Sequence, residues 1–287
     1  MFEHIVVPLD GARLAEQALG PAVSVAREED AHIHLVTVES PTIVDLEPSL
    51  GVFDEDYLES VAASVREVGV SRVSTKRLEG GGIAHALEAY RTSVGAGLTV
   101  MCTHGRGVVQ RAWLGSVADA LVRTSEAPVL LVRATDGAVS PMNDLRAAKR
   151  FERVLVALDG SHFSREALES AARLGGKSAV YILARVVAGA GEAADERSKK
   201  DRTLAEAKMS LEVQSFASGG YTVESITDFA PSVAQGILDF AKRREADIVV
   251  IATHARRGVE RLILGSVADK VIRGADLPVL VVRPRGP

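Results

Sequence analysis

The stretch "VMCTHGRGVVQRAWLGSVADALVR", residues 100–123, runs from a short apolar segment through a glycine-containing loop into a Gly-Ser pair that opens an amphipathic helix. A second version, "VIATHARRGVERLILGSVADKVIR", occupies residues 250–273, with Ala255 in the place of Gly105. Glycine before a helix lets a ligand approach the backbone closely, and the unpaired N–H groups of the first turn favour an anion. The stretch therefore predicts a strand, loop and helix able to hold a phosphate, present in two versions.

The rest of the chain is duplicated in the same way. "HIVVPLDGARLAEQAL" near the N-terminus returns as "RVLVALDGSHFSREAL", and Gly115 and Gly265 lie 150 positions apart. A period this long indicates two duplicated domains and not a solenoid of short repeats. We expect a first domain at residues 1–133, a linker rich in turn formers and charge at 134–150, and a second domain at 151–287.

Each copy alternates short apolar runs with longer helical patterns. Runs such as "DIVVIA" are apolar without alternation, which is typical of parallel strands covered on both faces. Each half is therefore expected to form an open, doubly wound α/β sheet in a three-layer α/β/α arrangement. The expected strands are residues 5–9, 33–38, 70–78, 98–103 and 129–132, then 154–158, 180–187, 222–227, 248–253 and 279–282. The expected helices of the first copy are residues 12–28, 55–68, 83–93 and 116–125.

The composition excludes several classes of protein. A net charge of -4 argues against a broad electrostatic grip on nucleic acid or an anionic membrane. The single cysteine, Cys102, excludes an internal disulfide framework and any Cys-rich metal site, and it fits a reducing compartment. No run approaches the roughly 20 apolar residues that span a bilayer, and the first apolar run is too short for a signal peptide. We expect a cytoplasmic protein.

Polar residues follow several of the predicted strands. Asp10 follows the first strand and Val38 ends the second, so both should lie with the Thr-His-Gly loop at the carboxyl edge of the sheet, where open α/β sheets bind ligands. A carboxylate there can accept hydrogen bonds from ribose hydroxyls or an adenine amine. Alternatively, Asp10 and its repeat Asp159 N-cap the helices that follow. The two interpretations are compatible.

The Gly115-Ser116 pair has a similar alternative. A hydroxyl at Ser116 would add a hydrogen-bond donor for a phosphate at the helix start. Ser116 with Asp119, repeated as Ser266 with Asp269, also fits an acidic variant of the capping box. The chain has neither a G-x-x-x-x-G-K-[ST] loop nor a G-x-G-x-x-G turn, which argues against the two commonest classes of nucleotide enzyme.

Catalytic and metal chemistry have less support in the sequence. His104 and His254 have no evident triad partner and are interpreted as polar loop residues, and Cys102 as a small packing residue. No acidic or cysteine cluster suggests a metal, so no catalytic or metal-binding residue is assigned. Residues 40–57 form a long connection that is either a functional lid or a disordered loop.

Together, "VVPLDG", "THG", the "LGSVAD" that follows nine residues later and "APVLLVR" resemble the universal stress protein family. The second half matches through "VALDGS", "ADIVVIATHA", "LGSVAD" and "LPVLVVR". The resemblance implies a tandem member with two five-stranded parallel sheets of the Rossmann-like, adenine nucleotide α-hydrolase-like type. It also implies an edge strand used for pairing and, in one branch of the family, ATP binding through the motif G-x-x-G-x9-G-[ST].

The same resemblance implies the residues of a nucleotide site in each copy. In the first copy these are Pro8, Leu9, Asp10, Val38, Met101, Cys102, Gly105, Gly115, Ser116 and Val117. In the second copy they are Leu158, Asp159, Val186, Ile251, Gly265, Ser266 and Val267. Cys102 replaces the first glycine of the motif, Ala252 and Ala255 replace two glycines in the second copy, and Ala157 stands where the first copy has proline. The first copy thus keeps two of the three glycines of the motif and the second keeps only the last, so we expect ATP to bind in the first copy and the site of the second copy to be degraded.

These features predict a stress-response or regulatory protein that binds ATP, with or without Mg²⁺, and for which no enzymatic activity is assigned. The degraded second motif favours the alternative of a non-nucleotide interaction or scaffolding protein of the same fold. Slow ATP hydrolysis or self-phosphorylation at a pocket serine has least support. The repeated "PVLLVR" and "PVLVVR" predict that the last strands of the two halves pair as an internal pseudo-dimer, and a further homodimer is compatible with this.

Overall fold

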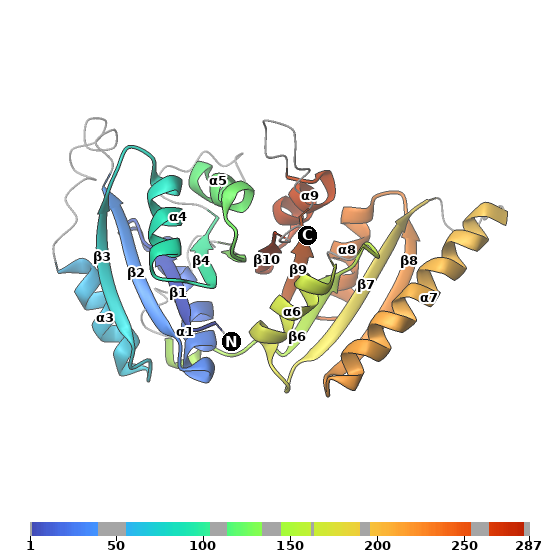
Figure 1. Cartoon of the computed structure of the whole chain (residues 1–287), viewed down its shortest axis with the longest axis horizontal. Helices are drawn as coiled ribbons and strands as arrows, with labels where there is room; N and C mark the ends of the chain where they lie inside the picture. The colour runs from blue at the N-terminus through green and yellow to red at the C-terminus, as the bar shows by residue number, and fades with distance from the viewer. Residues whose placement is uncertain are drawn as a thin grey trace. The chain divides into compact units, whose positions relative to one another are not determined.

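The chain divides into two compact units, residues 1–150 and 151–287, in the computed structural model (Figure 1). The structure describes residues 2–39, 56–103, 114–133, 145–161, 164–189, 196–253 and 264–283. Most of the expected loop at 40–57 and most of the expected linker lie outside these residues. Residues 145–150 belong to the first unit and include a short 3-10 helix, η4 (Leu145–Ala147).

The first unit is a five-stranded parallel sheet in the order β3-β2-β1-β4-β5 (Figure 1). Its strands are β1 (His4–Pro8), β2 (His32–Glu39), β3 (Val73–Glu79), β4 (Leu98–Cys102) and β5 (Val129–Val132). Its helices are η1 (Ala15–Ala18), α1 (Leu19–Glu29), α3 (Tyr57–Glu67), α4 (Ile83–Ser93) and α5 (Ser116–Thr124). The chain moves outward through α1 and α3 and returns through α4 and α5, so right-handed crossovers place the two pairs on opposite faces.

The second unit repeats this topology with the order β10-β9-β6-β7-β8, again with parallel pairs. Its strands are β6 (Arg153–Ala157), β7 (Val180–Ala188), β8 (Thr222–Ala230), β9 (Ile248–Ala252) and β10 (Val279–Val282). Its helices are α6 (Ser164–Gly175), α7 (Glu196–Ser218), α8 (Val233–Arg243) and α9 (Ser266–Gly274). The expected doubly wound α/β fold is confirmed in both halves.

The burial of the strands explains the sequence patterns. All five residues of β4 are buried, because helices cover both faces of a central parallel strand. The edge strand β3, "VSTKRLE", is polar and largely half-exposed or exposed. No helix within the described residues is long and apolar enough to cross a membrane.

Two expected starts were wrong, and the strand expected at 222–227 continues to Ala230. The helix predicted at 12–28 is the 3-10 turn η1 followed by α1, which starts at Leu19. Pro21 lies in the first turn of α1 and has no N–H, so a continuous α-helix from residue 12 would lose a hydrogen bond there. The strand predicted to begin at residue 70 begins at Val73, because Gly69 adopts a φ of 95° in the turn after α3.

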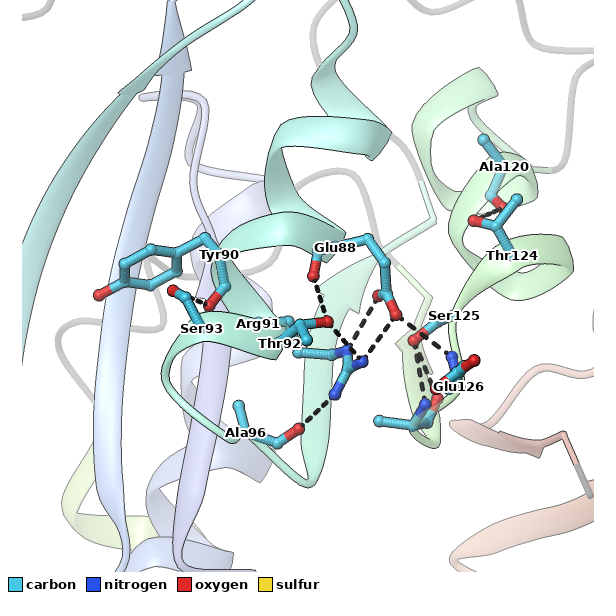
Figure 2. A network of polar contacts seen from close by, with 11 residues as sticks. Glu88, Tyr90, Arg91, Thr92, Ser93, Ala96, Ala120, Thr124, Ser125 and Glu126 are labelled. Carbon is cyan, nitrogen blue, oxygen red and sulfur yellow. Dashed lines mark hydrogen bonds and ion pairs between the residues drawn. The ribbon is translucent and has the colours of Figure 1, made fainter. Parts of the chain in front are cut away.

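A polar network joins α4 to the end of α5 (Figure 2). Arg91 is only 8% exposed, donates to both carboxylate oxygens of Glu88 at 2.9 and 2.8 Å, and donates to the carbonyl oxygen of Ala96 at 2.9 Å. Glu88 in turn accepts a hydrogen bond from the N–H of Glu126, just beyond α5, at 3.3 Å. The network therefore fixes the helix whose first turn contains Ser116.

Candidate functional site

The strand register brings the predicted site residues to one edge of the first sheet. Pro8 pairs with Val36, so Asp10 continues level with Val38. Ile5 pairs with Leu98, so the residues after β1 lie level with the end of β4. Neighbouring parallel strands are about 4.8 Å apart, and the direction of winding reverses between β1 and β4. This edge is the topological switch point, where open α/β sheets bind ligands.

Asp10 closes a turn and does not cap a helix. Its Oδ1 accepts a hydrogen bond from the N–H of Ala12 at 2.9 Å, and Gly11 between them adopts a φ of 76°. The following helix, η1, has Leu14 as its N-cap residue, so the N-cap interpretation of Asp10 was wrong. The side chain is held at the carboxyl end of β1 because a left-handed glycine permits the tight turn there.

Asp159 forms the same turn in the second unit. Its Oδ1 accepts from the N–H of Ser161 at 2.9 Å, and Gly160 has a φ of 78°. Helix α6 begins only at Ser164, so Asp159 is not its N-cap either. Asp159 is exposed, whereas Asp10 is half-buried. The two copies thus share a backbone turn but differ in the surroundings of the carboxylate.

No side chain among the described residues caps the start of α5. Gly115 is the N-cap residue, and Ser116 is the exposed first residue of the helix. Asp119 turns away and binds Arg123 through two hydrogen bonds of 2.7 and 2.9 Å. The capping-box interpretation was therefore wrong, because the carboxylate finds a cation one turn along the helix. The N–H groups of a first helical turn lack intrahelical acceptors, and Ser116 in this turn is exposed.

The second unit shows the same arrangement at α9. Gly265 is the N-cap residue without a side-chain cap, and Asp269 binds Arg273 at 2.9 and 3.0 Å. The capping-box interpretation of Ser266 and Asp269 was therefore also wrong, because the Asp269 carboxylate binds Arg273 instead.

Gly115 serves close packing and not an unusual backbone conformation. Its φ is -61°, which any residue can adopt. Its N–H donates to the carbonyl oxygen of Thr103 at 2.7 Å, and a Cβ at this position would lie 3.1 Å from that oxygen. At Gly265 a Cβ would meet nothing within 4 Å among the described residues. Glycine is therefore more strictly required in the first unit.

The remaining predicted pocket residues lie around the same edge in each unit. Leu9 and Met101 are buried, and Pro8 and Val38 are half-buried. In the second unit, Ala157 pairs with Ala184, which places Val186 at the position that Val38 has in the first unit. Leu158 and Ile251 are buried, and Val117 and Val267 occupy the second position of α5 and α9.

Cys102 is a packed, neutral thiol. It is 7% exposed, and its Sγ donates to the carbonyl oxygen of Ala15 at 3.6 Å. Burial raises the pKa of this thiol to about 12, whereas the nearby Ala18 backbone lowers it slightly and Asp10 raises it further. The side chain is directed at η1, which accounts for how β4 accommodates a cysteine at the glycine position of the motif.

Cys102 is expected to resist thiol reagents in the native chain. Because the thiolate is the nucleophile and its pKa is raised to about 12, iodoacetamide at pH 8 should leave native Cys102 unmodified and alkylate it fully in denaturant. Mass spectrometry of the intact chain measures both states. Rapid alkylation of the native protein would show that the β4–η1 contact opens readily.

The two units differ behind the aspartate turn. Thr37 is buried, and its Oγ1 has no hydrogen-bond partner among the described residues. The equivalent residue of the second unit is Arg185, whose guanidinium lies against Gly160, so that any Cβ there would overlap it. The second turn therefore has a bulky cation where the first has a small hydroxyl.

Several predicted residues lie outside the described part of the chain. They are Gly105, His104, His254 and Ala255. A hollow of about 420 Å³ that the sequence did not indicate lies between the loop Gly80–Gly82 and α4, beside Tyr90. No predicted site residue lines it.

The chain is similar to known proteins along nearly its whole length. A family model described as "Universal stress protein family" matches residues 1–133 and 150–283. A universal stress protein of Mycolicibacterium smegmatis is 27% identical over 300 residues, which cover 98% of this chain and 97% of the relative. One from Methanocaldococcus jannaschii is 29% identical over 147 residues, 46% of this chain and 83% of the relative.

Two solved structures share the fold over nearly the whole length. A universal stress protein from Archaeoglobus fulgidus has a TM-score of 0.74 at 19% identity, with 99% of each chain covered. A functionally unknown protein from Pseudomonas aeruginosa has a TM-score of 0.70 at 20% identity, with 99% of this chain and 93% of the other covered.

Proposed function

The chain belongs to the universal stress protein family, and on that premise we propose that its first unit binds one adenine nucleotide, ATP, at the carboxyl edge of β2, β1 and β4. The observation that carries the proposal is the start of α5, which no side chain of the described residues caps and which lies beyond β4, next to the switch point of the sheet. An uncapped helix start supplies N–H donors and a positive dipole end to a phosphate.

Each part of the nucleotide has a chemically suitable partner in this proposal. The first-turn N–H groups at Ser116 and Val117, with the Ser116 hydroxyl, would hold phosphate oxygens, and Gly115 would let the nucleotide approach the backbone closely. The Asp10 carboxylate is fixed by its turn and would accept hydrogen bonds from ribose hydroxyls. Val38 would give the base an apolar contact. Magnesium usually binds through substrate phosphates, so Mg²⁺ would arrive with the nucleotide.

The second unit is proposed to bind nucleotide more weakly, because its site has lost several features. Asp159 is more exposed than Asp10, Arg185 crowds the turn, and Ala157 replaces Pro8. A nucleotide that binds one conformation preferentially stabilises that conformation, which is how binding without turnover could regulate a partner in a stress response. No catalytic residue is assigned to this role.

Calorimetric titration of the full chain with Mg-ATP tests the proposal. Wild type should bind about one equivalent tightly. Ser116→Glu should weaken this binding at least about tenfold, or about 1.4 kcal/mol, because a carboxylate repels phosphate at the helix start. An acidic residue in a first helical turn favours the helix, so loss of folding would not explain the result.

The duplication supplies the matched control. Ser266→Glu makes the same change at the start of α9 and should leave the tight site unchanged. If Ser266→Glu abolishes binding and Ser116→Glu does not, the tight site belongs to the second unit and the assignment is wrong. If the wild type neither binds Mg-ATP nor copurifies with nucleotide, the scaffolding alternative replaces the proposal.

A further inference from the structure

Three histidines meet at the amino ends of β1 and β2, at the opposite edge of the first sheet from the proposed nucleotide site. His4 is the first residue of β1, and His32 and His34 are the first and third residues of β2. The register pairs His4 with His32, and one ring nitrogen from each of the three residues lies within 4.8 Å of the others. His32 and His34 share one face of the sheet because strand side chains alternate.

The rings are already arranged around a common centre. His4 Nδ1 lies 3.0 Å from His34 Nε2, and the rings of His32 and His34 are stacked with their centroids 4.2 Å apart. A tetrahedral zinc ion with Zn–N distances of about 2.0–2.1 Å holds its nitrogen ligands about 3.3–3.4 Å apart. The His4–His34 pair would therefore have to open by only a few tenths of an ångström to accept an ion.

The far side of His34 is held by two hydroxyl groups. Its Nδ1 lies 3.1 Å from the hydroxyl of Tyr90 on α4 and 3.1 Å from the Oγ of Ser74 on β3. Tyr90 leaves α4 on the side away from the Arg91 network (Figure 2). Metal-bound histidines usually have such a partner on the second ring nitrogen, which sets the tautomer and orients the ring. With the proton on Nδ1, the Nε2 lone pair of His34 faces His4.

Burial and neighbouring charges lower the pKa of two of the three histidines. Burial, followed by the charges of His32, His4 and Arg72, lowers the pKa of His34 to about 4. Burial, His4 and Arg72 also lower the pKa of His32. The positive charge of Arg72 would weaken the attraction of the cluster for an ion.

The second unit shows that the fold does not require the cluster. The equivalent positions of the second unit carry Arg153 in place of His4, Val180 in place of His32 and Ile182 in place of His34. By the register of β7 and β8, the residue equivalent to Ser74 is Glu224. The residue equivalent to Tyr90 is Phe240, since each is the eighth residue of its helix, α4 or α8. Every polar group of the cluster is replaced, and Arg153 and Glu224 form an ion pair at 3.5 Å instead.

We propose that His4, His32 and His34 bind one divalent transition-metal ion, with Zn²⁺ as the best fit, and that Tyr90 and Ser74 position His34. Imidazole ligands suit zinc, copper, nickel and iron, and three histidines leave a fourth tetrahedral position for water. The ion would link β1 to β2 and so stabilise the first unit, by an amount that grows with the logarithm of the free metal concentration above the Kd. The site is independent of the nucleotide proposal.

Zinc titration of the full chain, after removal of metals with a chelator and without nucleotide, tests the site. Calorimetry should give one equivalent of bound Zn²⁺, and Zn²⁺ should raise the Tm. The knockout combines His4→Arg, His32→Val, His34→Ile and Ser74→Glu, which are the residues that the second unit carries. It should fold and lose that equivalent. Unchanged zinc binding in this variant would overturn the proposal, as would absence of binding in the wild type.

Two further variants separate positioning from ligation. Tyr90→Phe, which copies Phe240, should retain the bound equivalent but weaken its affinity about 10–100-fold. His85→Gln removes an exposed histidine of α4, copies Gln235 and should change nothing. If the fourfold variant is unstable, His32→Val alone removes a half-buried ligand. The visible spectrum of bound Co²⁺ should then change, because it reports the number of nitrogen ligands; an unchanged spectrum would contradict the site.

Discussion

Arg91→Ala is expected to lower the free energy of unfolding of the first unit by about 3 kcal/mol. The double variant Glu88→Leu/Arg91→Ala should lower this free energy much less. Arg91 is buried and makes hydrogen bonds to both Glu88 oxygens and to Ala96 (Figure 2). Removing the arginine alone leaves a largely buried carboxylate without its cation. Replacing both partners by apolar residues removes the charge that needed compensation.

The second unit supports the double replacement. Helix α8 carries Leu238 and Ala241 at the positions of Glu88 and Arg91 in α4. Leu238 packs against Gly274 at the end of α9, where the first unit has the polar contact to α5. The same helix pair is therefore held by charge in one unit and by an apolar contact in the other. Equal losses in the single and the double variant would contradict this account.

Urea unfolding followed by hydrogen exchange, resolved by peptide, measures the effect in the first unit alone. Burial by itself would raise the pKa of Glu88, but hydrogen bonds and charge from Arg91, with contacts to Ser125 and Glu126, lower it below its ordinary value. This stabilisation is present above the unfolded pKa of about 4.5 and is lost as the pH falls through the lowered value. The double variant should therefore be less sensitive to acid than wild type.

Tyr181→Ala is expected to cost the second unit about 3–5 kcal/mol of unfolding free energy. Tyr181 on β7 is fully buried, and its ring meets those of Phe216 and Tyr221 edge-on at 5.0 and 5.4 Å. Its hydroxyl donates to the carbonyl oxygen of Gly176 at 2.6 Å. The truncation removes the aromatic anchor of α7, so amide exchange should rise first in that helix.

Two variants serve as controls for this prediction. Tyr181→Phe keeps the ring and loses only the hydrogen bond, and should cost about 1 kcal/mol. Leu211→Ala changes an exposed residue of the same helix, 67% accessible, and should have almost no effect on stability. A loss for Tyr181→Ala no greater than that for Tyr181→Phe would show that the ring contributes little.

The sequence was sufficient for the fold because its decisive signals are local. Non-alternating apolar runs, helix-period segments between them and the repeat at 150 positions predicted two parallel sheets, and both sheets and the family are confirmed. The carboxyl-edge position of Asp10 and Gly115 followed from the order of strands and helices. The pairing of the last strands of the two halves stays a prediction, as does the nucleotide itself.

The sequence could not choose between partners that compete for one side chain. Asp119 fits a capping box by spacing, yet it binds Arg123; Asp10 fits an N-cap, yet it closes a turn with Ala12. Both alternatives have similar local geometry and energies of about 1 kcal/mol, so the surrounding packing decides between them. Such choices cannot be made from spacing alone.

By itself the sequence determined the duplicated α/β architecture, since the period of its apolar residues dictates which faces must be buried. Only the tertiary structure decided that Cys102 packs on η1, that Gly115 lies against Thr103, and that His4 meets His32 and His34. These contacts join residues that are distant along the chain. Strand register and crossover geometry bring them together, and neither is encoded in any single segment.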